Sequence, residues 1–338
     1  MPLVFSNTDI HGKAESQNGH DALPATQPLG SLVHAIQPAA HAAAAPEFHV
    51  PMNCLTGEDK ARQIWRAAGS LHTESTRSSG GVELALAESE DFLFVTAEAD
   101  ADLPIEQQSF TCYTALLQTL RAHRKPHPLR IWNYITRINE AEGGVERYKS
   151  FNSGRRQAFR NLGFTVSEGA PAACALGKQH GPLQIAILAA RRPPVPIENP
   201  RQTSAYHYPN QYGIDPPIFS RAAWFQQAEG AGLLLISGTA SIVGHQTLHL
   251  GDVMAQAEET VKNLQSLLDV AHRKAGAPLW RLADLKGRVY VRRAADYPRV
   301  KAYLESLGMH DFSYHEADVC RSELLVEIEA EGQALRAS

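Results

Sequence analysis

The segment Gly232-Leu-Leu-Leu-Ile-Ser237 is the stretch from which the fold can be worked out. Its short, continuous apolar run is typical of a buried strand. The residues that follow predict a long helix at Asp252–Ala275 with one apolar stripe, made of Met254, Ala257, Val261, Leu264, Leu268 and Ala271. A strand at Leu285–Arg292, a helix at Tyr297–Leu307 and a strand at Glu323–Ala330 complete this half of the chain. Its predicted order is β-α-β-α-β.

The first half of the chain shows the same order. Its predicted strands are Asp91–Thr96, Leu129–Ile138 and Leu183–Ala190, and its predicted helices are Gln107–His123 and Gly143–Asn161. A Pro-rich, extended tract at 191–200 separates the two halves. The sequence therefore predicts an α+β protein built from two copies of one unit, which are related by element order rather than by residue identity.

The N-terminal region lacks such a pattern. Residues 1–50 are rich in Ala, His, Pro, Gln and Asn without sustained periodicity, so we expect an irregular arm of undefined role. The two units then occupy 51–195 and 196–338. Residues 75–81, which are rich in Ser and Gly, predict a loop.

Composition narrows the function classes. The 338 residues carry a formal net charge of −4, which argues against a general nucleic-acid binder. No apolar run reaches the roughly 18–20 residues of a membrane span, and Met1–Ile10 does not resemble a signal peptide. The four cysteines are scattered and form no CxxC pair, which favours a cytoplasmic protein with free thiols. An anionic small molecule stays compatible, because a few local arginines suffice to hold carboxylates.

The standard nucleotide and nucleophile motifs are absent. There is no GxGxxG after a strand, no GxxxxGK[ST] and no GxSxG, so neither a nucleotide cofactor nor a serine nucleophile elbow is expected. His245-Gln-Thr-Leu-His249 has the spacing of a zinc helix, but Gln246 replaces the Glu that would act as a base. A polar turn is favoured there over a metal site.

Two segments carry polar side chains suited to binding an anion. Tyr148, Asn152 and Arg155 share one face of the predicted helix, where Tyr and Arg could hold a carboxylate. The alternative is a solvated Arg beside a Tyr that lines the core. The loop Ser204–Gly213 contains three tyrosines, which either line a site or pack over the domain junction.

The final strand has two readings. Period-two alternation puts Glu327 and Glu329 on the face opposite Val326 and Ile328. The first reading is a solvent-facing acidic edge. The second is a partly buried carboxyl whose pKa is raised until it can donate a proton near neutral pH. Cys320 lies just upstream and suits an inert core position as well as a functional one.

Around these residues the chain resembles two related families. The segments Leu235–Ser241, Ala255–Leu264, Val289–Val291 and Val326–Ala330 resemble the RidA-like (YjgF) family over about residues 230–330. This resemblance implies a sheet packed by two helices and a cleft between neighbouring units. Such units usually assemble as trimers, so a chain with two of them is expected to be a monomer or a homotrimer.

Over nearly the whole chain after residue 90, the sequence resembles the chorismatases, which contain a RidA-like domain. The motifs that carry the resemblance are Trp132-Asn-Tyr134, Arg147-Tyr148 with Phe151 and Gly154-Arg155, Ser204–Gly213, Ser237-Gly-Thr-Ala240, and Cys320 with Glu327. The resemblance implies cleavage of chorismate, a dianion with an enolpyruvyl ether, without a cofactor or a metal.

The resemblance also implies roles for individual residues. Glu327 is expected to protonate the enolpyruvyl methylene, and trapping by the neighbouring ring hydroxyl gives an epoxide-like intermediate. Arg155 with Tyr148 is expected to hold a carboxylate, and Tyr208 or Tyr212 to contact the ring or the pyruvyl end. Further expected substrate contacts are Thr239, Ala240 and, for the second carboxylate, Arg292.

Product choice follows from two positions. In the family a Cys at the place of Cys320 accompanies formation of a hydroxybenzoate, and its absence accompanies hydrolysis to a dihydroxycyclohexadiene carboxylate. Ala240, where a Gly is expected for a pure 3-hydroxybenzoate former, resembles the branch that yields both 3- and 4-hydroxybenzoate for quinone or pigment synthesis. The competing hypotheses are a RidA-like imine or enamine hydrolase and a non-catalytic module that binds a small anion.

Overall fold

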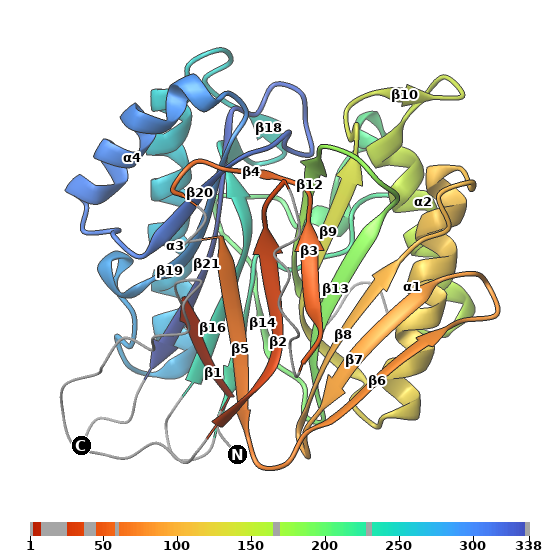
Figure 1. Ribbon diagram of the computed structural model, residues 1–338. Helices are drawn as coiled ribbons and strands as arrows, with labels where there is room; N and C mark the ends of the chain where they lie inside the picture. Colours follow the sequence, from red (N-terminus) through yellow and green to blue (C-terminus); the bar gives the residue numbers. More distant parts are fainter. Residues whose placement is uncertain are drawn as a thin grey trace.

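The computed structural model describes residues 3–7, 26–36, 45–57, 61–164, 170–227 and 232–334. The first half forms a six-stranded sheet in the order β12-β9-β13-β8-β7-β6. Its strands are β6 His72–Arg77, β7 Glu83–Glu88, β8 Phe92–Glu98, β9 His127–Thr136, β12 Ala172–Lys178 and β13 Gln184–Ala190. Its helices are α1 Ile105–Ala122 and α2 Arg147–Asn161, which lie side by side on one face of the sheet (Figure 1).

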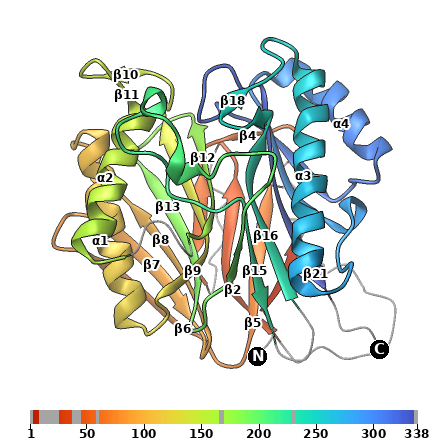
Figure 2. The same cartoon turned by 180° about the vertical axis from the view of Figure 1, so that it is seen from behind.

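The second half, joined by β4 from the first half, forms a seven-stranded sheet in the order β14-β15-β16-β21-β19-β20-β4. Its strands are β4 Asn53–Cys54, β14 Val195–Ile197, β15 Ala222–Gln226, β16 Gly232–Ala240, β19 Lys286–Val291, β20 Phe312–Glu316 and β21 Val326–Ala334. Helices α3 Val253–Ala275 and α4 Tyr297–Ser306 cover it (Figure 2). The two-residue strands β10 Ala141–Glu142, β11 Val145–Glu146, β17 Ile242–Val243 and β18 Gln246–Thr247 form two small ribbons, and short 3-10 helices span Ala205–His207, Asn210–Tyr212, Leu282–Asp284 and Ala294–Asp296.

The two halves share one topology. Each has the order β-β-β-α-β-α-β-β, so that β8, β9, β12 and β13 correspond to β16, β19, β20 and β21. In each half the last strand is inserted in the middle of the sheet, and the two strands that flank the second helix pair in parallel. The predicted α+β fold with two units of one kind is thereby confirmed, although each unit has more strands than the β-α-β-α-β order.

Local sequence explains where α3 begins and ends. Oδ1 of Asp252 accepts hydrogen bonds from the backbone N–H groups of Met254 and Ala255, at 3.0 and 3.1 Å, which caps two donors that the first helical turn leaves unpaired. Gly276 follows the last helical residue with a φ of 74°, a left-handed conformation that glycine adopts without strain. The predicted stripe of α3 packs into the core beneath the second sheet.

The predicted irregular arm at 1–50 is wrong for the part of it that the structure describes. Strands β1 Leu3–Asn7, β2 Thr26–His34 and β3 Glu47–Val50 join β5 Arg62–Ala68 in a four-stranded sheet of order β1-β5-β2-β3. Strands β1 and β2 pair with β5, beyond residue 60, and β3 pairs with β2, so the order of these strands is not visible in local periodicity.

Two other local predictions need correction. The predicted loop at 75–81 overlaps the end of β6, whose side chains are exposed on both faces, so the strand lacks an apolar alternation. The extended tract at 191–200 contains β14, an edge strand of the second sheet.

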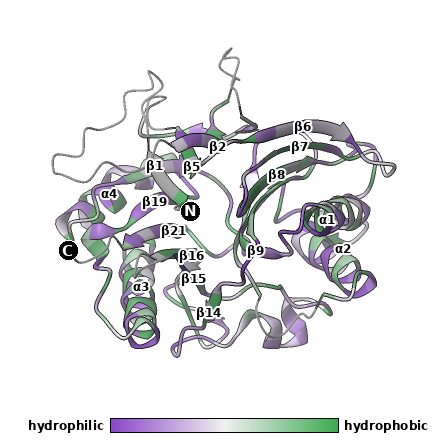
Figure 3. Ribbon diagram, turned by 90° about the horizontal axis from the view of Figure 1, so that it is seen from below, coloured by the Kyte–Doolittle hydropathy of each residue, from purple (hydrophilic) through white to green (hydrophobic). Residues whose placement is uncertain are grey.

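The three largest apolar cores of the described residues hold the layers together. One lies between the first sheet and α1 and α2, another between the second sheet and α3 and α4, and the third between the inner faces of the two large sheets and the four-stranded sheet. Figure 3 shows the helices outside and the strands curving around this shared interior. Among the residues that the structure describes, no helix combines the length and apolar character needed to cross a bilayer.

Candidate active site

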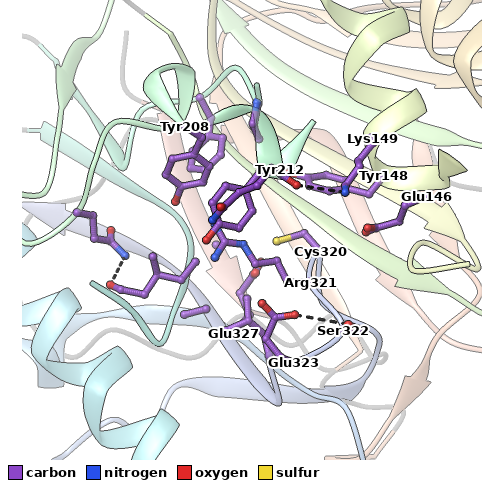
Figure 4. Close-up of a pocket in the computed structure, with 18 of the residues that line it drawn as sticks. Glu146, Tyr148, Lys149, Tyr208, Tyr212, Cys320, Arg321, Ser322, Glu323 and Glu327 are labelled. Atoms are coloured by element: carbon purple, nitrogen blue, oxygen red, sulfur yellow. Dashed lines mark hydrogen bonds between the residues drawn. The ribbon is translucent and has the colours of Figure 1, made fainter. Parts of the chain in front are cut away.

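A cavity of about 210 Å³ opens where the two halves of the chain meet (Figure 4). It is bounded by α2, the loop after β14, the end of β16 and the segment that precedes β21. Its lining residues are Glu146, Tyr148, Lys149, Gln202, Tyr208, Gln211, Tyr212, Pro217, Phe219, Arg221, Gly238, Ala240, Ile242, Cys320, Arg321, Ser322, Glu323, Leu324 and Glu327. We call this space the main cavity.

A smaller inner pocket of about 30 Å³ adjoins the main cavity. The two share Tyr148, Phe219, Gly238, Cys320 and Glu327, and the inner pocket adds Arg155, Ala173, Cys174 and Ala175. The expected catalytic pair Glu327 and Cys320 therefore lies at the junction of the two spaces.

Glu327 is buried on a central strand. Strand β21 runs between β16 and β19, so the face that carries Glu327, Glu329 and Glu331 turns inward, while Val326 and Ile328 pack toward the helices. The exposed fractions of the three glutamates are 3%, 0% and 2%. The structure thus rules out a solvent-facing acidic edge and confirms the reading of a buried carboxyl.

Burial keeps the carboxyl group of Glu327 protonated, as a proton donor must be. Loss of solvation and then the negative charge of Glu329 raise the pKa of Glu327 to about 8, against a smaller opposing effect of Arg130. Glu329 behaves in the opposite way, since Arg288 and Arg130 outweigh its burial and lower its pKa to about 2. Oε1 of Glu327 has no hydrogen-bond partner among the described residues. A neutral carboxyl group therefore faces the cavity at neutral pH.

A glycine in β16 makes room for this carboxyl. The pairing of β16 with β21 shifts register between Ile236 and Thr239, so Ser237 and Gly238 form a bulge opposite Glu329. A Cβ on Gly238 would lie 2.0 Å from Oε1 of Glu327. The Ser237 hydroxyl fixes the bulge, because it donates to the carbonyl of Ser220 at 2.6 Å and accepts from the Ala173 N–H at 2.9 Å.

Cys320 lines the cavity as a neutral thiol. Its side chain is partly buried, and Figure 4 shows its Sγ turned toward the middle of the cavity. Burial first, and then the nearby Glu327, raises the pKa of Cys320 to about 12. The group therefore acts as a thiol at neutral pH and not as a thiolate nucleophile.

Helix α2 supplies the predicted Tyr–Arg face. Tyr148 lines both spaces, and Arg155 lies in the wall of the inner pocket with only 3% exposure, so it is not a solvated Arg. Nη2 of Arg155 donates to Oδ1 of Asn152 at 2.6 Å, and its guanidinium lies 5.1 Å from the centroid of the Phe151 ring. Its Nε–H has no acceptor among the described residues. The prediction that these side chains share one face is confirmed.

The Tyr-rich loop brings a second arginine to the cavity. Nη2 of Arg221, which is 4% exposed, donates to the Tyr208 hydroxyl and to the carbonyl of Thr203, both at 2.7 Å. The guanidinium also lies 5.0 Å from the centroid of the Phe219 ring. The Nε–H of Arg221 is buried and has no described acceptor.

A third arginine packs beneath Tyr212. The guanidinium of Arg321 lies 3.9 Å from the centroid of the Tyr212 ring, and Nη1 donates to the carbonyl of His245 and to Thr247. Its buried Nη2 has no described acceptor. Figure 4 shows Tyr212 and Arg321 at the centre of the cavity wall, beside Cys320. Tyr208 and Tyr212 therefore line the cavity as the loop was expected to do.

Of two further residues that were expected to contact substrate, Ala240 lines the main cavity and Thr239 does not. Ala240 lines the main cavity and pairs directly with Glu327 across the two strands. Thr239 lines neither space; its hydroxyl donates to the carbonyl of Ser237 at 2.8 Å and so supports the bulge.

Arg292 is not among the lining residues of either space. Its guanidinium bonds Asp318 and Asn139 and the carbonyls of Val319, Arg321 and Leu324. Arg292 thus holds the loop that carries Cys320, and its donors are used there. This position corrects the expectation that Arg292 meets the second carboxylate.

Arg221 and Arg321 are the site residues that the sequence did not point to. No periodic pattern includes either one, although Arg321 stands next to the nominated Cys320. None of Arg155, Arg221 and Arg321 forms an ion pair with a described carboxylate. Three buried guanidinium groups with unused N–H donors are costly unless an anion binds, so they favour a ligand with carboxylate groups.

The two histidines with zinc-like spacing have other neighbours. His245 contacts the Tyr212 hydroxyl at 3.3 Å and His249 lies 3.4 Å from Glu259. Within the described ranges, no group of three or more His, Cys, Asp or Glu side chains is arranged to hold a metal ion.

Comparisons with known proteins agree over most of the chain. A family model described as chorismatase FkbO/Hyg5-like, N-terminal, matches residues 63–189. A 3-hydroxybenzoate synthase of Streptomyces hygroscopicus is 33% identical over 296 residues, which cover 84% of this chain and 84% of the relative. A chorismatase of the same organism is 35% identical over 288 residues, which cover 82% of this chain and 81% of that relative. A crystal structure of a chorismatase aligns over 98% of both chains with a TM-score of 0.82 and 30% identity.

Proposed function

Because the chain belongs to the chorismatase family, we propose that it converts chorismate to pyruvate and 3-hydroxybenzoate, with 4-hydroxybenzoate as a second product. One observation supports this most strongly. A protonated, unpartnered carboxyl group, that of Glu327, lies between the main cavity and the inner pocket, whose walls hold three guanidinium groups that each keep an N–H without a described acceptor. An acid beside an anion site is what protonation of a dianionic enol ether requires.

Different arginines bind the two carboxylates of chorismate. Arg155 and Tyr148 on α2 hold one carboxylate at the inner end. Arg221 and Arg321, which approach from the opposite side with their rings Tyr208 and Tyr212, hold the other. Charge-assisted hydrogen bonds of this kind fix orientation as well as affinity. They place the enolpyruvyl methylene at Glu327.

The reaction starts with proton transfer from Glu327 to the methylene carbon. The adjacent carbon becomes an oxocarbenium centre, and the oxygen of the neighbouring ring hydroxyl then bonds to the ring carbon that carries the ether. The ring C–O bond breaks, and pyruvate leaves with the ether oxygen as its carbonyl. The hydroxyl proton returns to the carboxylate of Glu327. No water and no redox equivalent is consumed, and the remaining ring carries an epoxide.

Opening of the epoxide gives the aromatic product. One epoxide C–O bond breaks, the ring loses a C–H proton, and the oxygen gains a proton, so the phenol is an isomer of the epoxide. Cys320, a neutral thiol beside Glu327, stands where it can guide this step and keep water from the ring. Ala240, paired with Glu327 across the strands, shapes the same end of the cavity and so bears on which C–O bond breaks.

The experiment that tests this proposal mixes purified protein with chorismate and separates the products. We expect pyruvate and hydroxybenzoates in equal total amounts. A dihydroxycyclohexadiene carboxylate as the main product would support a hydrolase instead. No reaction of chorismate, combined with turnover of an amino-acid-derived imine, would support a RidA-like hydrolase and overturn the proposal.

A further inference from the structure

A cluster of buried charges lies behind Glu327 and lines neither the main cavity nor the inner pocket. It consists of Arg130 on β9, Arg288 on β19 and Glu329 on β21, with exposed fractions of 0%, 1% and 0%. We call these residues the triad. They come from both halves of the chain, since β9 belongs to the first unit and β19 and β21 to the second.

The contacts within the triad hold Glu329 as an anion. Its Oε2 accepts from Nη2 of Arg130, and its Oε1 accepts from Nε of Arg288 and, at 2.7 Å, from the hydroxyl of Tyr290. Cys174, in the wall of the inner pocket, also helps to lower the pKa of Glu329. Such a number of donors around one buried carboxylate stabilises its charged form.

Arg130 links the triad to the strand that carries the bulge. Its Nη1 donates to the carbonyl of Ile236, the last paired residue of β16 before Gly238. The guanidinium also lies 5.6 Å from the centroid of the Trp132 ring, which restricts its movement. One side chain of the first half thus fixes both Glu329 and the backbone that surrounds the Glu327 carboxyl.

We propose that the triad is a positioning device for the proton transfer, in which Arg130 and Arg288 hold Glu329 as a fixed negative charge so that Glu327 keeps its proton until substrate is bound. This inference rests on the proposed function, because it gives Glu327 the role of the acid. The triad itself does not touch the cavity, so its residues act through Glu327.

The other groups that face Glu327 do not replace this charge. Cys174 on β12, Cys320 in the preceding loop, Tyr148 on α2 and Tyr290 on β19 are neutral at neutral pH, because burial raises the pKa of each. The remaining charged groups line the main cavity or the inner pocket together with Glu327; they are Arg155, Arg221, Arg321, Glu323, Glu146 and Lys149. Among the residues that the structure describes, only Glu329 and Arg130 join burial in shifting the pKa of Glu327, and they act in opposite directions.

Because Glu329 and Arg130 shift the pKa of Glu327 in opposite directions, substituting each of them tests the proposal. In Glu329→Gln the fixed negative charge is lost, so the pH at which kcat/KM for chorismate falls on the alkaline side should move down by about one unit, which is about tenfold in rate above that pH. In Arg130→Gln the positive charge is lost while Arg288 and Tyr290 still hold Glu329, so the same pH should move up. Arg130→Lys keeps the charge and should stay near wild type.

Glu331→Gln is the matched control. Glu331 lies two residues further along the same buried face and accepts from Gln63 at 3.3 Å, but it is not among the groups that shift the pKa of Glu327. Its substitution should leave the alkaline limb in place. Unfolding curves of all variants show that the comparison is made on folded protein.

A direct titration separates this inference from the proposed function. The infrared C=O band of the protonated Glu327 carboxyl, assigned by its loss in Glu327→Gln, should disappear at a lower pH in Glu329→Gln and at a higher pH in Arg130→Gln. This readout needs no turnover, so inactive wild-type protein would contradict the function but not the triad. Equal midpoints in wild type and in whichever charge variants fold would overturn the triad.

Discussion

A Cβ added to Gly238 would stand 2.0 Å from Oε1 of Glu327 and 3.3 Å from Cβ of Cys174, so the bulge of β16 and the acid of β21 are fitted to each other. Real Cβ atoms do not approach an oxygen so closely, and a side chain at position 238 must therefore displace the carboxyl. The absence of a side chain at position 238 thus determines where the protonated carboxyl group of Glu327 lies.

Gly238→Ala should lower kcat by about tenfold to a hundredfold, because a displacement of about 1 Å at the reacting group has effects of that size. Overpacking should also cost about 1–3 kcal/mol of unfolding free energy. Steady-state kinetics and urea unfolding measure the two effects. Gly80→Ala is the control, since its Cβ would meet Thr111 at an ordinary 3.7 Å. Wild-type kinetics in both variants would contradict the close fit.

The activity should depend on pH through Glu327. The acid works only in its protonated form, and burial raises the pKa of Glu327 to about 8, so kcat/KM should fall tenfold per unit at pH values above about 8. A pH–rate profile of the free enzyme measures this limb. A fall that begins near pH 5 would show that Glu327 has an ordinary pKa and is not held protonated.

The same shift makes a prediction about stability. The folded pKa of Glu327 lies above the value of 4.5 for an ordinary Glu, so the folded state retains a proton that the unfolded state releases. Its contribution to stability is complete below pH 4.5 and is lost as the pH rises through about 8. Urea unfolding between pH 5 and 9 should therefore show a smaller loss of stability in Glu327→Gln, which keeps the neutral form, than in wild type. Parallel curves would contradict this.

Two arginines should fail in different ways. In wild type the guanidinium of Arg221 bonds Tyr208 and keeps one N–H free. Arg221→Lys keeps the charge but loses this forked group, so KM for chorismate should rise by about tenfold or more with little change in melting temperature.

Arg292→Ala removes the bonds that hold the loop of Cys320, so it should lower the melting temperature and kcat together. A pure KM effect in Arg292→Ala would restore that residue to the binding site.

Cys320 should control the product. Cys320→Ala removes the thiol beside Glu327 and opens space for water, so product should shift from hydroxybenzoate toward the dihydroxycyclohexadiene carboxylate while pyruvate is still released. Cys320→Ser, which keeps a hydrogen-bonding group, is the matched variant and should retain more aromatic product. Chromatography of the ring products measures the ratio, and an unchanged ratio in Cys320→Ala would remove the residue from this role.

Local pattern predicted the parts of the molecule that depend on local physics. The apolar stripe of α3 is visible in the sequence, and the helix begins and ends within a residue of the prediction. The period-two pattern put Glu327 and Glu329 on one face, but not whether that face is buried. That depends on β16 and β19, which flank β21 and lie far from it in the chain.

Other features depend on partners that the sequence does not place. The strand β1 pairs with β5, which is about 60 residues away, and so its region lacks a recognisable strand signal. Arg292 and Arg221 are both arginines near a strand end, and nothing local tells them apart. Their roles differ because backbone carbonyls of a loop use the donors of Arg292, whereas one donor of Arg221 is left free beside the cavity.

The role of Glu327 is tested most directly by following the proton that it transfers. Wild type and Glu327→Gln are given chorismate in D₂O, pyruvate is trapped at once as lactate, and its deuterium content is read by mass spectrometry. If Glu327 is the acid, wild type gives pyruvate with one deuterium in the methyl group, and Glu327→Gln gives no pyruvate above background. Pyruvate without deuterium, or undiminished release by Glu327→Gln, would contradict the claim that Glu327 protonates the methylene carbon.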